Sequence, residues 1–398
     1  MLIVAAVTAA TASPAGAQTS SDPVATAKAH LGPLAMTPRV TVSNLGVDTN
    51  VFNTVDNPQQ DFTVTMTPST QVWMHLGRAL LSGNFGTGIV YYRKFKSQRG
   101  IETTDSLRLD LPLNRLRTYA MDSYANARQR PNSEIDARAR YTTNTVTAGV
   151  DLVLLGQMSV GAYGRLDETR YARGELFYGA DLGQLLNRRG NTVGVRIRDP
   201  LTPFTTITLS GEASQDRFAS SPERNSDSTT GSFGIEFTPQ ALISGAASVG
   251  YQRFRPLGPG VPGYRGVTAS VGLNYVLLGV TKFGVQVNRN VQYSFDVNAP
   301  YYVDTGVTVS IAQRLFGPVD LLARAANEQL AYRNLTVGST SPLGRVDTVR
   351  TYGGGIGYRL GNDFTVGVNA NLVRRISAVD LRRYQGLQVG MNVTYGGS

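Results

Sequence analysis

Residues 282–293 have the sequence KFGVQVNRNVQY, and this stretch decides the fold because apolar and polar residues alternate along it. In an extended chain Phe283, Val285 and Val287 share one face, while glycine, glutamine and asparagine occupy the other. The same period of two recurs at residues 206–214, 267–275 and 364–372. A period of two predicts β-strands that have one apolar and one polar face.

The connections between the predicted strands alternate in length. Short turns are predicted at residues 76–77, 112–114, 155–156, 199–203, 238–240, 278–279, 316–318 and 361–362, and longer polar loops at 48–60, 94–100, 129–132, 171–190, 215–228, 255–265, 294–300, 335–344 and 376–381. These connections join eighteen strands, or sixteen if residues 171–198 are divided differently. Short turns at one end and long loops at the other predict an all-β fold, a transmembrane antiparallel up-and-down barrel of the bacterial outer-membrane type.

Composition separates this barrel from its alternatives. The chain has 398 residues, of which 41% are hydrophobic and 17% charged, and it has no cysteine. An apolar run of about 18 residues, which a membrane-spanning helix needs, does not occur. A water-soluble sandwich also alternates, but its polar face would be rich in Lys and Glu, whereas this one is rich in Gly, Ser, Thr, Asn and Gln. The barrel is therefore the favoured fold.

The first residues predict export from the cytoplasm. Residues 1–17, MLIVAAVTAATASPAGA, have the apolar core and the small-residue cleavage site of a Sec-type signal peptide, although a basic start is missing and the true translation start is expected further upstream. A short buried segment is the alternative. Residues 18–38 are then a periplasmic lead-in with at most two helical turns at 25–31, and residues 39–398 are the barrel.

The last predicted strand contains a candidate assembly signal. In QVGMNVTY, a polar Gln388, then Gly390, an apolar Val393 and an aromatic Tyr395 resemble the signal recognised by the outer-membrane barrel insertion machinery. Three residues follow Tyr395, so recognition is expected to tolerate a short tail or to be weaker. An ordinary terminal strand is the alternative interpretation.

Charged residues fall at positions that alternation places on the polar, lumen-facing side of the strands. The chain carries 38 Lys and Arg against 28 Asp and Glu, a formal net charge of +10. Two interpretations stay open: a charged lining that selects ions, or Arg–carboxylate pairs that fill the interior. The pore-lining candidates are Arg108, Arg128, Arg138, Arg140, Arg165, Arg196, Arg198, Lys282, Arg314, Arg324, Asp110, Asp122, Asp151, Asp167, Glu212, Glu236, Asp320 and Glu328.

A second set of basic residues lies at the predicted long-loop end. These residues are expected to contact phosphates of outer-membrane lipopolysaccharide or an acidic polysaccharide, since an arginine-rich surface favours anionic partners. Nucleic acid is not expected as a partner of an exported protein. The candidates are Arg93, Lys94, Lys96, Arg99, Arg188, Arg189, Arg253, Arg255, Arg374, Arg375, Arg382 and Arg383.

No catalytic constellation is evident. Residues 258–263, GPGVPG, satisfy G-x-G-x-x-G, but prolines interrupt them and no helix follows, so they predict a loop and not a phosphate site. His75 has no identifiable serine and carboxylate partners. Two histidines and no cysteine leave little for a metal site. We expect neither an enzyme nor a cofactor.

Several strings resemble the putative beta-barrel porin 2 family: GVDTNVF at 46–52, DFTVTMTP at 61–68, EIDARARY at 134–141, LTPFTTITL at 201–209 and DRFASSPERNSDS at 216–228. The resemblance spans nearly the whole mature chain and consists of short patterns. It implies an outer-membrane porin-like barrel, of a group with members encoded beside exopolysaccharide genes. It transfers no catalytic residues.

Two functions follow as expectations for a Gram-negative outer-membrane protein. The first is a passive, weakly anion-favouring channel, with export of an anionic exopolysaccharide as its more specific form. The second is a plugged barrel that acts as a scaffold or receptor among polysaccharide-export components. For that alternative, loop 171–190, with Leu182, Leu185 and Leu186 at near-helical spacing, is the candidate constriction. The transported solute and the oligomeric state are not predicted.

Overall fold

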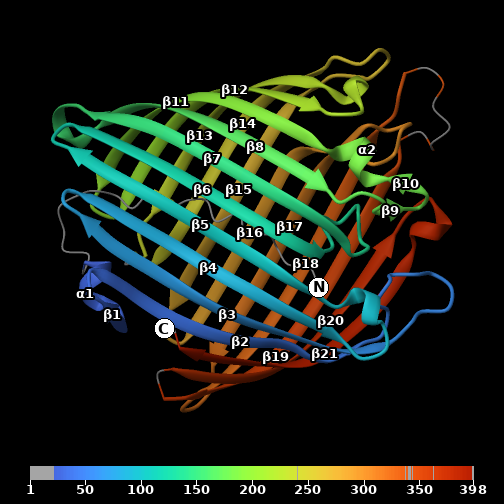
Figure 1. The fold of residues 1–398 in the computed structure, drawn as a ribbon, viewed down its shortest axis with the longest axis horizontal. Coiled ribbons are helices and arrows are strands. Elements are labelled where there is room, and N and C mark those ends of the chain that lie inside the picture. Colours follow the sequence, from blue (N-terminus) through green and yellow to red (C-terminus); the bar gives the residue numbers. More distant parts are fainter. Residues whose placement is uncertain are drawn as a thin grey trace.

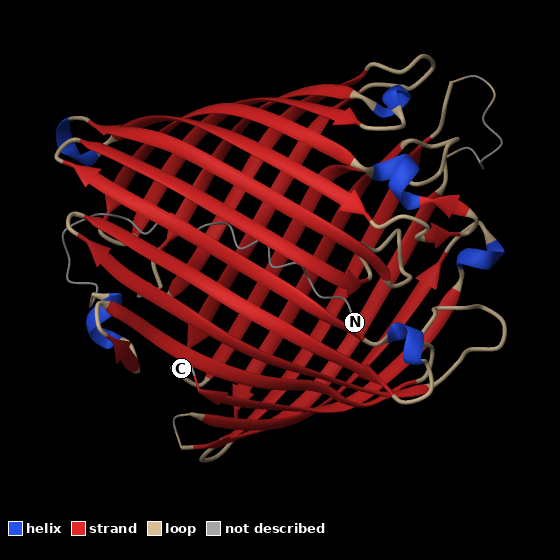
Figure 2. Cartoon of the chain, viewed as in Figure 1, coloured by secondary structure: helices blue, strands red, loops and turns tan. Residues whose placement is uncertain are grey.

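The chain forms a closed antiparallel β-barrel (Figures 1 and 2). The computed structural model describes residues 22–396 except 240, 337, 339–341, 343 and 362. Each barrel strand pairs with its neighbours along the chain, and β2 pairs with β21 to close the ring. The eighteen strands are β2 (Leu34–Asp48), β3 (Asp61–Leu76), β4 (Ala79–Tyr92), β5 (Gly100–Leu113), β6 (Leu116–Gln129), β7 (Ala139–Val153), β8 (Ser159–Tyr171), β11 (Arg188–Thr202), β12 (Thr205–Phe218), β13 (Ser226–Phe237), β14 (Ile243–Pro256), β15 (Tyr264–Leu277), β16 (Thr281–Tyr293), β17 (Tyr301–Arg314), β18 (Val319–Arg333), β19 (Val346–Leu360), β20 (Phe364–Ile376) and β21 (Tyr384–Gly396).

The predicted fold class and the count of eighteen strands are confirmed. Short turns and long loops occur at the predicted places, and Gly77 and Gly279 supply the positive φ angles, 62° and 69°, that two of the tight turns require. We call the two ends of the barrel the short-turn end and the long-loop end; in barrels of this type the long-loop end is extracellular. The predicted signal peptide, residues 1–17, lies outside the described residues.

A short segment before the barrel lies at the short-turn end (Figure 1). Helix α1 (Pro23–Thr26) is a single turn, and β1 (Ala29–Leu31) forms a hairpin with the start of β2. Lys28 forms an ion pair with Asp363 in the β19–β20 turn, and His75 Nε2 lies 3.0 Å from a carboxylate oxygen of Asp22. The first barrel strand begins at Leu34 and not at residue 39, because this hairpin extends it.

Short helices and two short strands lie within the connections between barrel strands. The long-loop end carries η1 (Lys96–Gln98), β9 (Leu176–Phe177), β10 (Ala180–Asp181), α2 (Leu182–Leu186), η3 (Pro222–Arg224) and η4 (Asp380–Arg382), and a short turn carries η2 (Leu155–Gln157). Within the described part of the chain, no helix has the length and apolar character needed to cross a membrane.

Alternation gives the wall two chemically different faces. In β11, Val193 and Val195 are 66% and 61% exposed on the outer face, the side of the wall away from the lumen, while Arg196 and Arg198 face the lumen. A bulge in β2 shifts this phase: the register with β21 changes between Val42 and Leu45. A side chain at Gly46 would meet the carbonyl oxygen of Val389 at 2.0 Å, so the bulge requires glycine there.

The buried core is not in the wall but inside the mouth, at the long-loop end. One cluster joins Ile135, Leu182, Leu186 and Phe177 from different loops with Phe218 of β12. A second cluster joins side chains of β17, β18 and β19. Burial of apolar surface therefore stabilises the arrangement of the loops, while the wall itself is stabilised by strand pairing.

Candidate functional site

Most of the lumen-facing arginines are paired with carboxylates. Arg196 lies 2.7 Å from Asp151, and Arg198 lies 2.7 Å from Glu236. Further pairs along the wall are Arg108–Asp110 at 2.6 Å, Arg138–Glu102 at 3.1 Å, Arg165–Asp167 at 3.0 Å and Arg314–Asp320 at 3.8 Å, and Glu212 accepts a hydrogen bond from the Tyr163 hydroxyl. This arrangement matches the interpretation in which arginine and carboxylate pairs fill the interior.

Two lumen-facing candidates differ from the rest. Among the described residues, Lys282 and Arg324 have no carboxylate within ion-pair distance. Lys282 is near the start of β16 and Arg324 is in the first half of β18, so both belong to the short-turn half of the wall. The uncompensated positive charge of the lumen wall thus lies on the side that faces the periplasm in barrels of this type.

Three pore-lining candidates lie on the outer face instead. Asp122 is opposite Leu107 and Val146, which are exposed outward, and Arg140 is opposite Arg128. Asp122 and Arg128 lie on the side of β6 opposite to Tyr119, which faces the lumen, and Arg140 shares the outer side of β7 with Val146. Local alternation is therefore a poor guide in this strand, and the expectation that Asp122, Arg128 and Arg140 line the pore is corrected.

The loop between β6 and β7 crosses the lumen. Ser133 Oγ donates a hydrogen bond of 2.5 Å to Glu328 on β18. Strand β18 is on the opposite side of the ring from this loop: eight barrel strands separate it from β7 in one direction and seven separate it from β6 in the other. Residues 133–136 are all buried, with Glu134 and Ile135 at 0% exposure. This loop is therefore an internal element of the barrel.

A buried charge network, formed by Asp136, Arg345, Asp347, Arg375 and Arg382, holds this loop in place. The Arg375 guanidinium lies 3.0 Å from Asp136 and 2.5 Å from Asp347, and its side chain is 0% exposed. Arg345 and Arg382 bind the same two carboxylates, at 2.8 Å and 3.4 Å. Each carboxylate is thus shared by two guanidinium groups, which compensates its burial.

The loop between β16 and β17, residues 294–300, is the contact point for the other loops. Ser294 Oγ donates a 2.5 Å hydrogen bond to Glu134, and Arg224 donates to the carbonyl oxygens of Ser294 and Pro300. Arg345 lies 3.6 Å from Asp296. The ring of Phe295 packs edge-on against Phe177 at 4.8 Å. Loops from five connections around the mouth are thereby tied together.

Two features follow from this packing. Residues 301–304 at the start of β17 are 1%, 2%, 1% and 8% exposed, so both faces of this strand end are covered, unlike the rest of the wall.

Burial also raises the pKa of Glu134 from 4.5 to about 7, against the opposing effects of Ser294 and Arg382. The charge of Glu134 therefore changes near neutral pH.

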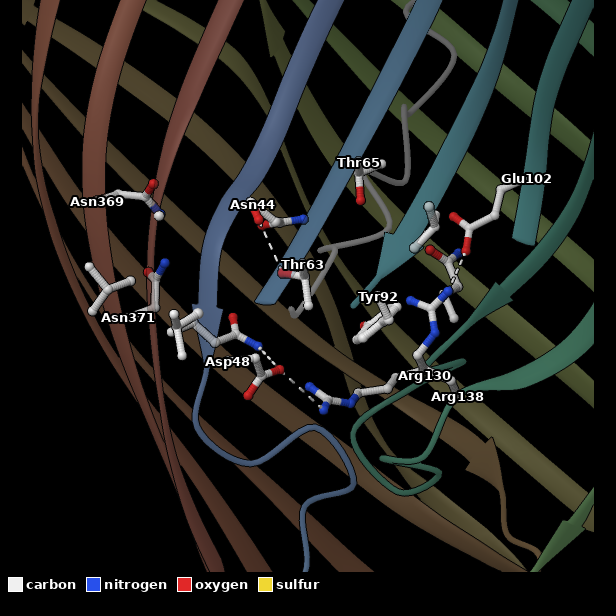
Figure 3. A pocket seen from close by; sticks show the side chains of 16 residues that line it. Asn44, Asp48, Thr63, Thr65, Tyr92, Glu102, Arg130, Arg138, Asn369 and Asn371 are labelled. Atoms are coloured by element: carbon white, nitrogen blue, oxygen red, sulfur yellow. Dashed lines mark hydrogen bonds and ion pairs between the residues drawn. The ribbon is translucent and has the colours of Figure 1, made fainter. Parts of the chain in front are cut away.

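A polar pocket lies on the inner wall beside the β6–β7 loop (Figure 3). Its charged residues balance in sign: Asp48 and Glu102 against Arg130 and Arg138, with Arg138 5.3 Å from the Tyr92 ring centroid. Asparagine side chains add further hydrogen-bond donors and acceptors. They are contributed by Asn44, Asn369 and Asn371. The pocket can therefore accept a neutral, hydroxyl-rich group. In the described residues no cluster of His, Asp or Glu could hold a metal ion.

The loop that the sequence singled out also reaches across the mouth, because the Tyr178 hydroxyl donates a 2.9 Å hydrogen bond to the carbonyl oxygen of Leu381 in the β20–β21 loop. In loop 171–190, Leu182 and Leu186 are 1% and 2% exposed and pack in the cluster that contains Ile135. The β6–β7 loop and loop 294–300 were predicted as polar loops, but their position inside the barrel was not. Two signals could have pointed to them: an isoleucine between two acidic residues at 134–136, and the run YYV at 301–303, which is apolar on both faces.

The basic residues of the long-loop end divide into two groups. Arg93, Lys94, Lys96 and Arg374 are exposed, and Arg383 lies 2.8 Å from Asp380. Arg375 and Arg382, at 2% and 3% exposure, belong to the buried charge network, so the expectation that they contact lipid or polysaccharide is corrected. The candidate assembly residues lie on β21, where Gln388 donates a hydrogen bond to Asp48 and Tyr395 is 62% exposed.

Comparisons with known proteins agree on the type of barrel. The profile of the family described as "Putative beta-barrel porin 2" matches residues 22–396. OccK2 (OpdF) of Pseudomonas aeruginosa, solved alone and in complex with glucuronate, is similar in structure with a TM-score of 0.50 and 10% identity over 91% of this chain and 97% of that one. OpdK of the same organism, solved with vanillate, has a TM-score of 0.48 and 11% identity over 91% and 98%.

A longer chain is also among the similar structures. The FrpB iron transporter of Neisseria meningitidis has a TM-score of 0.42 and 11% identity, and the match covers 86% of this chain but only 62% of the FrpB chain. No curated protein sequence matches this chain. At such low identities the similarity in structure concerns the fold alone.

Proposed function

Since the chain belongs to the putative beta-barrel porin 2 family, we propose that it is a passive outer-membrane channel for small polar solutes, constricted by its β6–β7 loop. The observation that carries this proposal is the polar lumen wall with a loop stretched across it, from Ser133 to Glu328. An eighteen-stranded ring is wide enough for an aqueous passage, and in this proposal the loop that crosses it narrows that passage.

The charge distribution supports a weak preference for anions. Most lumen arginines are neutralised by the carboxylates beside them, so they contribute little net potential. Lys282 and Arg324, which lack such partners among the described residues, leave an excess of positive charge in the short-turn half. Charges that line an aqueous passage alter ion selectivity through the local potential.

Export of an anionic polysaccharide is the more specific form of this proposal. A polymer exported from the periplasm would enter at the short-turn end, where Lys282 and Arg324 lie. The neutral, amide-lined pocket beside the β6–β7 loop suits hydroxyl groups of a sugar. Passage of a polymer would require the loops of the mouth to move. An oligouronate added at the short-turn side should therefore reduce the current more strongly than when added at the other side.

A plugged, non-conducting scaffold is the second candidate, and the interlocked loops favour it. Single-channel recording in planar bilayers separates the two. We compare the wild type with a variant in which residues 131–136 are replaced by two glycines, and with a control shortened at Lys96–Gln98, a segment with contacts only to its own end of the wall.

A measurable wild-type conductance that rises in the 131–136 variant, and not in the control, supports a constricted channel. No wild-type conductance would overturn the channel and support the scaffold. Equal conductance of the wild type and the 131–136 variant would overturn the role of this loop as the constriction.

A further inference from the structure

Besides Arg128–Arg140 and Arg189–Arg217, two further pairs of arginines lie directly opposite each other on the outer face of the wall. Arg253 on β14 is opposite Arg265 on β15, and Arg350 on β19 is opposite Arg374 on β20. All four side chains are exposed, and among the described residues none has a carboxylate within ion-pair distance. Like charges directly opposite each other destabilise a sheet. An anion bound between the two arginines would offset this repulsion.

Other arginines on the same face do have a shared carboxylate. Arg170 and Arg189 both lie 2.7 Å from Glu168. Arg217 and Arg255 lie 2.8 Å and 3.1 Å from Asp227. The missing carboxylate at Arg253–Arg265 and at Arg350–Arg374 is therefore not a general property of the outer face.

The position of these pairs along the barrel matches a layer of lipid headgroups. Tyr251 and Tyr352, 58% and 52% exposed, each lie on the outer face two residues nearer the middle of the wall than Arg253 and Arg350. Outward aromatic residues mark the membrane interface in barrels of this type. Two residues of a strand span about 7 Å, so the guanidinium groups lie just beyond that interface, on the long-loop side.

A shallow groove on the outer face leads to Arg253. It crosses β7, β8, β11, β12 and β13, where small outward residues lie beside Val150, Val193 and Val195, and it ends at Tyr251 and Arg253. Its floor is formed by Ala148, Ala162, Gly164, Gly211, Ala213 and Gly231. A Cβ atom placed on Gly164 or Gly231 would meet no atom within 4 Å, so the groove is open space. An apolar groove that ends at Arg253, whose cross-strand neighbour is Arg265, matches an amphipathic anion.

We propose that the outer face over β7 to β15 binds one phosphorylated lipid of the outer leaflet, a lipid A type of molecule, with a phosphate between Arg253 and Arg265 and an acyl chain in the groove. The planar guanidinium group donates two parallel hydrogen bonds to phosphate oxygens. Two such groups neutralise the charge of a phosphate, and the phosphate in turn relieves the repulsion between the two guanidinium groups. This site is on the lipid side of the wall and does not depend on the proposed channel.

Native mass spectrometry of the detergent-solubilised full chain, loaded with bisphosphorylated lipid A, tests the proposal. We compare the wild type, R253Q/R265Q and a control, R170Q/R189Q, that also removes two outer-face charges. The wild type and the control should retain the lipid, while R253Q/R265Q should retain roughly tenfold less, because charge-assisted hydrogen bonds to phosphate are lost. Dephosphorylated lipid A should be retained weakly by all three, and inorganic phosphate in excess should not displace the bound lipid.

A second pair of variants tests the groove without altering charge. Gly231→Leu fills the groove, whereas Gly354→Leu adds the same side chain to the outer face of β19, outside it. Only the first should lower lipid retention. The change in gel mobility on heating reports whether each variant is folded. Equal retention by wild type and folded R253Q/R265Q, equal retention of dephosphorylated lipid, or displacement by inorganic phosphate would overturn the proposal.

Discussion

The two halves of the lumen use the same residue types in opposite ways. At the long-loop end, Arg375 is fully buried between Asp136 and Asp347, and its charge fixes loops to one another. At the short-turn end, Lys282 and Arg324 face the lumen without a carboxylate partner among the described residues. A buried and compensated charge contributes to structure, whereas an uncompensated charge on an aqueous wall contributes to the potential that ions experience.

The largest expected effect comes from breaking the buried charge network. Arg375→Met removes the buried cation that contacts both Asp136 and Asp347. Removal of one partner of a buried ion pair lowers the free energy of unfolding by about 3–5 kcal/mol. Thermal unfolding, followed by gel mobility after heating, should show a clear loss of stability.

The neighbouring residue supplies the control for this change. Arg374 is exposed on the outer face, and Arg374→Met should alter stability by no more than about 0.5 kcal/mol. Equal stability of the two variants would contradict the structural role assigned to the network.

A smaller effect concerns pH at the long-loop end. Burial raises the pKa of Glu134 from 4.5 to about 7, so the folded protein keeps this proton at pH values where the unfolded chain releases it. The contribution to stability is fully present below about pH 4.5 and is lost as the pH rises through 7, with a magnitude of ~3 kcal/mol.

Glu134→Gln tests this pH dependence. Glutamine preserves the shape and cannot ionise, so the variant should keep its stability as the pH rises from 4.5 to 8, whereas the wild type should lose part of it. Parallel stability curves for the two proteins over that range would rule out Glu134 as the responsible group.

The smallest expected effect concerns the short-turn end. In K282E/R324E the reversal potential under a salt gradient should shift toward cations, with a change in the permeability ratio of roughly two- to threefold. Its control is Arg350→Glu, a charge reversal on the outer face, which should leave selectivity unchanged. A shift in both variants, or in neither, would mean that Lys282 and Arg324 do not set the selectivity.

The sequence predicted the wall far better than the mouth. Alternation is local, so eighteen strands and most lumen positions could be predicted from neighbouring residues. It failed in β6, where Tyr119 faces the lumen and Asp122 faces outward, because neither side of that strand is strongly apolar. The contact between Arg375 and Ser133 joins residues 242 positions apart, and no local pattern encodes such a contact.

The central claim is that the buried charge network holds the β6–β7 loop across the lumen and thereby limits the current. Single-channel conductance of Arg375→Met in planar bilayers, with Arg374→Met as the control, tests it most directly. We predict a larger and noisier conductance for Arg375→Met, because the released loop no longer crosses the lumen, and a wild-type value for Arg374→Met. A wild-type conductance for a folded Arg375→Met variant would contradict the claim.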